Sequence, residues 1–172
     1  SVNAHDGDLT LKTANTVFAS AIATGKTDDG AQTGIGLGVA VNVAPIKTRS
    51  EIENEVIVGG AKDLSLAATT TPTVMTKAEA GASGTSFSLG GAVAVTYTDT
   101  KTTARLGTGA GTTPLTGALT VNAYEENGTT ATTADGAAAG PDVGVGVAVA
   151  VGVSTDAARA TTERVVSTTT TD

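Results

Sequence analysis

Three stretches of the chain alternate between large apolar residues and small ones. They cover residues 34–43, 89–97 and 143–153. The odd-numbered positions hold mainly Val, Ile and Leu, whereas the even-numbered positions hold mainly Gly and Ala. Because successive side chains of a β-strand point to opposite faces, this period of two predicts one long strand in each stretch.

Both faces of these predicted strands carry apolar or very small residues. A solvent-facing row would carry Thr, Lys or Glu, so we expect burial on both sides. The Val face is expected to fill a core, and the Gly/Ala face to let another backbone layer or a neighbouring chain approach closely. Exposure of the last Gly/Ala row to open water would contradict this expectation. The residues that we assign to this packing and assembly face are Gly34, Gly36, Gly38, Ala40, Gly90, Ala92, Ala94, Gly144, Gly146, Ala148 and Ala150.

A short leucine motif indicates that the chain is repetitive. Leu9-Thr10-Leu11, Leu64-Ser65-Leu66 and Leu119-Thr120-Val121 begin at intervals of 55 residues. Each motif leads through an Ala/Thr-rich segment into one of the alternating stretches, so the same elements recur in the same order. The Thr runs 69–71 and 168–171 are interpreted as loop or linker. We therefore divide the chain into a leading segment (1–8), three repeats (9–63, 64–118 and 119–166) and a Thr-rich linker or exit (167–172).

Each alternating stretch is followed by a polar segment that predicts a turn and then a shorter, solvated strand. The predicted turns are 44–47, 98–101 and 154–157. One repeat alone buries too little apolar surface to offset the entropy cost of ordering its backbone, so we expect the repeats to stack. This favours an all-β fold, namely a β-solenoid resembling a parallel β-helix, with three repeats of about 55 residues. The alternative is an antiparallel β-sandwich or hairpin stack, since a strand, a turn and a strand also describe a hairpin.

The composition limits the classes of function. The chain has 172 residues, no Cys or Trp, two Phe, two Tyr and a formal net charge of −7. Its ten Lys and Arg residues are scattered and form no basic stripe, so we expect no nucleic-acid partner. No uninterrupted apolar run reaches about 18 residues, so we expect no membrane span. The chain begins without Met and ends in a Thr run, and we expect it to be a piece of a longer protein.

The order of these elements resembles the repeats of very large bacterial surface proteins. The residues that carry the resemblance are the three leucine motifs and the runs 39–43, 93–96 and 147–151. Such proteins include filamentous adhesins of the leukotoxin and autotransporter type and related β-strand-repeat exoproteins. The resemblance implies a secreted β-solenoid at the cell surface with an adhesive or matrix role, and it supplies no catalytic residues. Residues 51–58 depart from the pattern, because they are longer and more acidic than their counterparts.

Few residues are candidates for metal binding or catalysis. Asp28 and Asp29 lie in a Thr-Asp-Asp-Gly segment with the chemistry of calcium loops, but further spaced acidic ligands are missing and a simple turn also explains them. His5, the only His, is likewise explained by a polar turn. Glu125 and Glu126 are adjacent, so on an extended chain they point apart and form no catalytic pair. We expect no enzymatic activity and no cofactor, with Ca²⁺ as the one alternative.

These features favour a structural or adhesive segment that forms an extracellular fibre, sheath or matrix by stacking of repeats. The expected partners are neighbouring repeats or copies of itself in a self-assembling filament, with glycans or cell surfaces as further partners. A ligand-binding module for Ca²⁺, glycans or ice is the second class. Ice binding would need regular Thr rows, whereas Thr is scattered here. A β-helical polysaccharide lyase or hydrolase would need aromatic residues in a groove, and the chain has very few.

Overall fold

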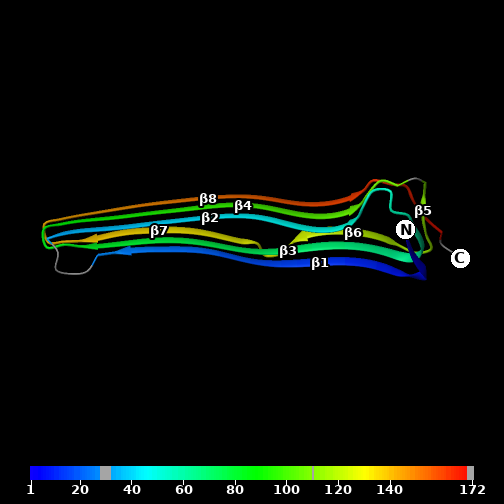
Figure 1. The fold of residues 1–172 in the computed structure, drawn as a ribbon, viewed down its shortest axis with the longest axis horizontal. Coiled ribbons are helices and arrows are strands. Elements are labelled where there is room, and N and C mark those ends of the chain that lie inside the picture. Colours follow the sequence, from blue (N-terminus) through cyan, green and yellow to red (C-terminus); the bar gives the residue numbers. More distant parts are fainter. Residues whose placement is uncertain (28–31, 110, 170–172) are drawn as a thin grey trace.

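The computed structural model describes residues 1–27, 32–109 and 111–169, and these ranges form nine β-strands. Five of the strands are 20 to 26 residues long, and they give the molecule the elongated form seen in Figure 1. The long strands are β1 (Val2–Lys26), β2 (Thr33–Ile52), β3 (Val58–Ser83), β4 (Phe87–Leu106) and β8 (Val143–Thr162). The shorter strands are β5 (Thr113–Leu115), β6 (Leu119–Glu125), β7 (Thr129–Ala139) and β9 (Val166–Thr168).

The strands form two sheets, and every strand pairing among the described residues is parallel. In the first sheet, β3 is the central strand. It pairs with β1 on one side and with the consecutive strands β5, β6 and β7 on the other, and β9 pairs with β5. The second sheet has the order β2-β4-β8. The chain runs along the first sheet and returns along the second, so that each pass out and back forms one rung (Figure 1). Rung 1 is β1 and β2, rung 2 is β3 and β4, and rung 3 is β5 to β8. The predicted all-β, β-solenoid class is confirmed, and the antiparallel alternative is wrong.

The register of the sheets places equivalent sequence positions side by side. Leu9 pairs with Leu64, which pairs with Leu119, so the leucine motifs form one column. Between β6 and β7 the register against β3 changes by one residue, because Asn127, with a φ of 47°, adds a residue to rung 3. The Asn-Gly pair therefore makes a local bend within a rung, and the strand direction is unchanged on either side of it.

The predicted turns after the alternating stretches are absent, because β2, β4 and β8 each continue without a break for 20 residues. In β2, inward-facing Ala44, Ile46 and Thr48 are buried, so the alternation that holds the strand continues through the predicted turn. Pro45 is compatible with this because β2 is an edge strand, where a missing amide hydrogen is tolerated. The predicted loop at residues 69–71 is likewise part of β3.

The space between the two sheets has three zones along the strand direction. At one end, where the chain turns from the second sheet back to the first, lies a cluster of large apolar side chains that includes Leu64, Leu66 and Leu106. The middle zone is lined by hydroxyl groups that bond across the sheets, such as Thr70 with Thr102 at 2.6 Å. The far end is a zone of small residues with a buried Ala cluster. The side chains inside a rung thus decrease in size from one end to the other.

The two end segments of the chain also lie partly in the sheets. Residues of the predicted leading segment 1–8 belong to β1, where Val2 already pairs with Val58 and the register is irregular between Asn3 and Leu9. Of the predicted linker or exit, Ser167 and Thr168 belong to β9. Residues 170–172 lie outside the described ranges.

Candidate functional site

The Gly/Ala face of β2, β4 and β8 points inward, toward the first sheet of the same chain. A methyl group added at Gly36 would overlap the carbonyl oxygen of Gly81, and one added at Gly90 would overlap that of Ala137. These contacts are with backbone atoms, which cannot rotate away. The small residues therefore let the two sheets of one chain approach closely, and the face assigned to packing and assembly is filled by the chain's own opposite sheet.

The position of a rung in the stack decides how much of this face water reaches. In the central rung Gly90, Ala92 and Ala94 are buried. The corresponding row of rung 3, at positions 144, 146, 148 and 150, is exposed, although Gly146 still faces the carbonyl of Gly136 in the opposite sheet. Exposure of this row in β8 contradicts the expectation that both faces of the strand are buried. The row is exposed because β8 is an edge strand.

The predicted core role of the Val face is wrong, because this face lies on the outside of the molecule. Its side chains form a continuous surface on β2, β4 and β8, which we call the apolar strip. Fourteen of its side chains are 37 to 66% exposed, and Leu89 and Val95 are half-buried between their neighbours. The strip consists of Ile35, Leu37, Val39, Val41 and Val43 of β2, Phe87, Leu89, Val93, Val95 and Tyr97 of β4, and Val143, Val145, Val147, Val149, Val151 and Val153 of β8.

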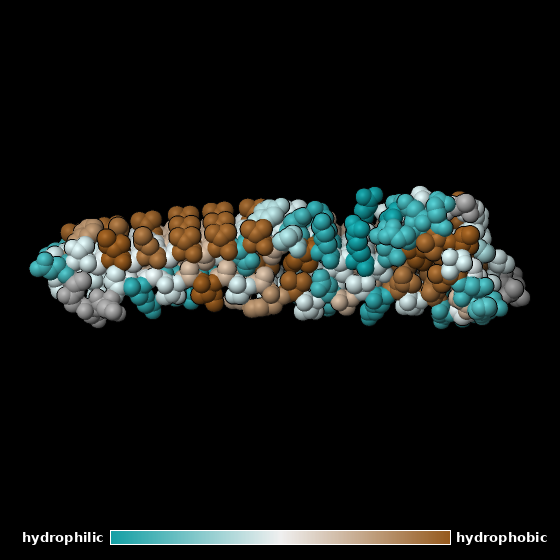
Figure 2. Space-filling view, in the orientation of Figure 1, coloured by the Kyte–Doolittle hydropathy of each residue, from teal (hydrophilic) through white to brown (hydrophobic). Residues whose placement is uncertain are grey.

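The parallel register aligns the strip into columns that cross the three rungs. Val39 pairs with Val93, which pairs with Val149, and three other columns are likewise apolar on all three strands. Gly91 interrupts the column of Leu37 and Val147, and Thr33 pairs with Phe87. Figure 2 shows the result as regular rows of apolar side chains over one half of the long face. A typical monomer exposes at most about 300–600 Å² in one apolar patch, so a strip of this extent marks an interaction surface.

The other half of the same face is polar and charged. Arg105 bonds the carboxylates of Glu51 in rung 1 and Glu163 in rung 3, the latter at 2.8 Å. The hydrogen bond from Arg105 to Glu51 is the main reason that the pKa of this guanidinium is raised above its ordinary value. Lys101 and Asp99 form a second ion pair at 2.7 Å. The outer face therefore has an apolar half and a half where opposite charges link successive rungs.

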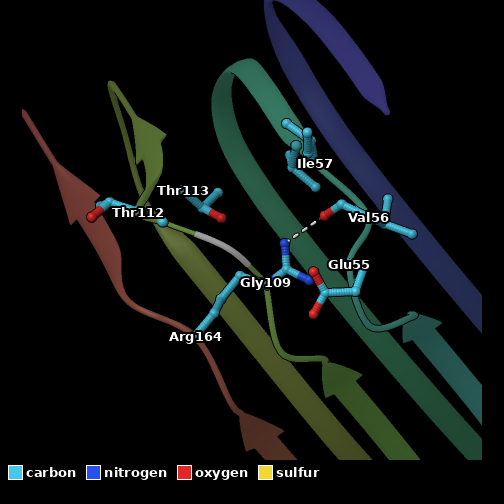
Figure 3. Close-up of a pocket in the computed structure, with 9 residues that line it drawn as sticks. Glu55, Val56, Ile57, Gly109, Thr112, Thr113 and Arg164 are labelled. Atoms are coloured by element: carbon cyan, nitrogen blue, oxygen red, sulfur yellow. Dashed lines mark hydrogen bonds between the residues drawn. The ribbon is translucent and has the colours of Figure 1, made fainter.

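Arg164 lines a small cavity of about 90 Å³ beside the turns between rungs (Figure 3). Its guanidinium donates hydrogen bonds to the backbone carbonyls of Val56 at 2.6 Å and Thr108 at 3.0 Å, and also to those of Gly107 and Glu53. These carbonyls belong to the turns that end rungs 1 and 2. The side chain is therefore a structural connection between three turns, and sequence reasoning missed it because a lone Arg gives no signal of its contacts.

A second cavity, of about 200 Å³, lies between the sheets at rung 3. Glu125 and Asp156 both line it, together with hydroxyl groups such as that of Ser154, which donates to Asp156 at 3.0 Å. Burial, and secondarily the charge of Asp156, raises the pKa of Glu125. Glu125 thus points into the interior at the edge of the stack, which the sequence pattern alone did not indicate.

The remaining predicted site residues form no recognisable centre. Asp28 and Asp29, the Ca²⁺ candidates, lie outside the described residues. His5 is exposed in β1 with a φ of 49°, next to Asp6 with a φ of 64°. Over the described ranges, no three His, Asp or Glu side chains gather closely enough to hold a metal ion. In the same ranges no helix is long and apolar enough to cross a membrane.

The fold and this surface together define a two-sheet parallel β-solenoid with close-packed Gly/Ala interiors and an apolar outer strip. Comparison with family models, with curated proteins and with solved structures finds no match to the chain.

Proposed function

We propose that this chain is a structural segment of a large extracellular surface protein, in which rungs stack into a fibre, sheath or matrix with an adhesive role. The observation that carries the proposal is the pair of open ends of the parallel stack. At one end β1 and β2 are edge strands, and at the other end β8 is an edge strand of 20 residues. Long, flat edges of this kind are templates for further strand pairing.

The two ends match each other in sequence and direction. β2 and β8 both begin with Gly alternating with Val, Ile or Leu, and both continue into Ala alternating with Val. A further rung, from the same chain or from another copy, can therefore place a β2-like strand on β8 with the register that already joins β4 to β8. Head-to-tail contacts of this kind do not close on themselves, so they build open filaments.

The dimensions of a rung make the expected assembly a wide tape. Strands of 20 to 26 residues span about 65 to 85 Å at roughly 3.3 Å per residue. Each rung adds only about 4.8 Å along the stacking direction. Such a tape offers a large surface per unit length, which suits a matrix or adhesive layer. We propose no enzymatic role, because the interior is filled by Thr, Ala, Gly and Leu, and outer charges such as Lys101 and Arg105 are paired with carboxylates.

Electron microscopy of the purified chain, with and without a chelator, tests this proposal. We expect tapes about 65 to 85 Å wide, with a repeat of about 4.8 Å in fibre diffraction. Ala148→Asp should shorten the tapes, because this inward position is exposed in β8 but would be buried under a following rung. Ala157→Asp, on the outer face of the same strand, should leave them intact. Compact, monodisperse monomers would contradict the proposal.

A further inference from the structure

We propose that the apolar strip is the interface with a second copy of this chain, packed face to face with the strands of the two copies antiparallel. This lateral pairing goes beyond the stacking of rungs, because it uses the outer face of the second sheet and leaves the strand edges free. Four features of the strip support it: its area, its contrast with the opposite face, its regular relief and the position of the charges.

The area of the strip is sufficient for a stable pair. The fourteen exposed side chains leave on the order of 1,000 Å² of apolar surface accessible per chain. A standard stable interface needs about 800 Å² from each partner. Each further rung in a longer stack would extend the strip by another row, so the interface grows with the length of the tape.

The opposite outer face, on the first sheet, provides an internal comparison. There the exposed side chains of β1 are mainly Thr, Ser, Lys and Ala, and the few large apolar ones include Phe18 and Ile22 of β1, with Met75 of β3 beside Ile22. Both faces are outer faces of the same rungs, so exposure alone does not account for the Val columns. The apolar residues are concentrated on the one face that our proposal places in contact.

The relief of the strip is self-complementary. Its columns of branched side chains repeat every second residue, about 6.6 Å along the strand, and leave parallel grooves between them. Identical rows of this kind interdigitate when two sheets pack face to face. The column of Val39, Val93 and Val149 lies nearest the middle of the strip, so a two-fold axis along the stacking direction runs close beside this column, where the rows of the two copies can interdigitate.

The charges decide the relative direction of the strands. If the strands were parallel, the polar halves would face each other and Lys47, Arg49 and Lys101 would lose solvent. Taking such charges out of water is costly, and for Lys101, which pairs with Asp99, the desolvation penalty offsets the Coulomb gain of the pair. With antiparallel strands the two apolar halves overlap and the charged halves project in opposite directions into water. The same two-fold axis keeps the stacking directions of both copies aligned, so a double-layered tape can grow.

Cross-linking tests this pairing, because the chain has no Cys of its own. Val93→Cys places a thiol close beside the proposed two-fold axis, where a short bifunctional maleimide can join facing sheets that lie about 10 Å apart. We expect covalent dimers from this variant and none above background from Thr10→Cys, which is on the outer face of the first sheet. Adding Val39→Glu and Val149→Lys should lower the dimer yield at least about tenfold, because each new charge would face its own copy. Thr10→Glu and Thr120→Lys is the matched pair on the opposite face and should leave the yield unchanged.

The outcomes separate this inference from the stacking of rungs. Ala148→Asp in the Val93→Cys background should shorten tapes and still cross-link, whereas the charged strip variant should form single-layered tapes that do not cross-link. Equal cross-linking of Val93→Cys and Thr10→Cys, or none from either, would overturn the face-to-face pair. So would a monomeric chain that binds phosphatidylcholine vesicles through the strip.

Discussion

Gly90 and Gly91 are neighbours in β4 and lie on opposite faces of this strand. Gly90 faces the first sheet, where an added methyl group would overlap the carbonyl of Ala137. Gly91 faces outward, where an added methyl group would meet only the Cδ2 atom of Leu37 at 3.0 Å. Leu37 is exposed and can change rotamer, so the first glycine is required by close packing and the second is not.

Gly90→Ala should therefore destabilise the fold by about 3 kcal/mol or more, because the sheets must move apart to admit the methyl group. Gly91→Ala should be neutral or stabilise by up to about 1 kcal/mol, since Gly is intrinsically unfavourable within a strand. Denaturant unfolding of the two variants beside the unaltered chain measures both effects. Equal stability of the two variants would contradict the inward assignment of the Gly/Ala face.

Alternation predicts the strands at the scale of residues, but it does not tell which face is inside. The pattern at 143–153 correctly indicates that Val and Gly/Ala point to opposite sides. Size then suggested that the Val side fills the core, and this is wrong. A core between two sheets is normally about 10 Å thick, whereas here backbones approach so closely that only hydrogen or methyl groups fit between them.

Successive rungs are connected by polar contacts that no single element contains. The long strands continue through positions that predicted turns, where hydroxyl groups of neighbouring rungs bond to each other, as Thr98 does to Ser154 at 2.9 Å. At the turns, Arg164 of the third rung bonds carbonyls of the first two. These contacts are between residues distant in sequence, so the local pattern could not reveal them.

Arg164→Ala should destabilise the fold by about 2 kcal/mol, because the turn carbonyls lose a charged donor that no neighbour replaces. Amide hydrogen exchange should become faster at residues 53–57 and 107–109. Arg159→Ala is the control, since Arg159 is exposed and makes no hydrogen bond or ion pair within the described ranges. Unchanged exchange at both turns in Arg164→Ala would show that the turns hold without it.

Glu125 lies in rung 3, at the open end of the whole stack. Its carboxylate faces Asp156 in the cavity between the sheets, and burial raises its pKa above the ordinary value of 4.5. In the unfolded chain the same carboxyl titrates near that ordinary value. The folded state therefore binds the proton more tightly, and Glu125 lowers stability as the pH rises from about 4.5 through its raised pKa.

Glu125→Gln should thus raise the melting temperature at pH 7 and have progressively less effect as the pH falls below about 4.5. The neutral amide keeps the shape of the side chain and removes the cost of ionisation near Asp156. Thermal unfolding followed by circular dichroism over this pH range measures the difference. Glu126→Gln is the neighbouring control, because that residue is exposed outside the cavity. A stabilisation of Glu125→Gln that does not vary with pH would rule out the titration.

The sequence by itself determined the strands, the spacing of the leucine motifs and the all-β, stacked class, because period-two alternation and repetition are local properties of the chain. Leu9, Leu64 and Leu119 do stand side by side in the parallel sheets. Only the tertiary structure decided that each long strand turns its Gly and Ala inward and its Val outward. That choice depends on how closely the strands of the opposite sheet approach, in the same rung and in the next one, a distance set between segments about 10 to 50 residues apart in the sequence.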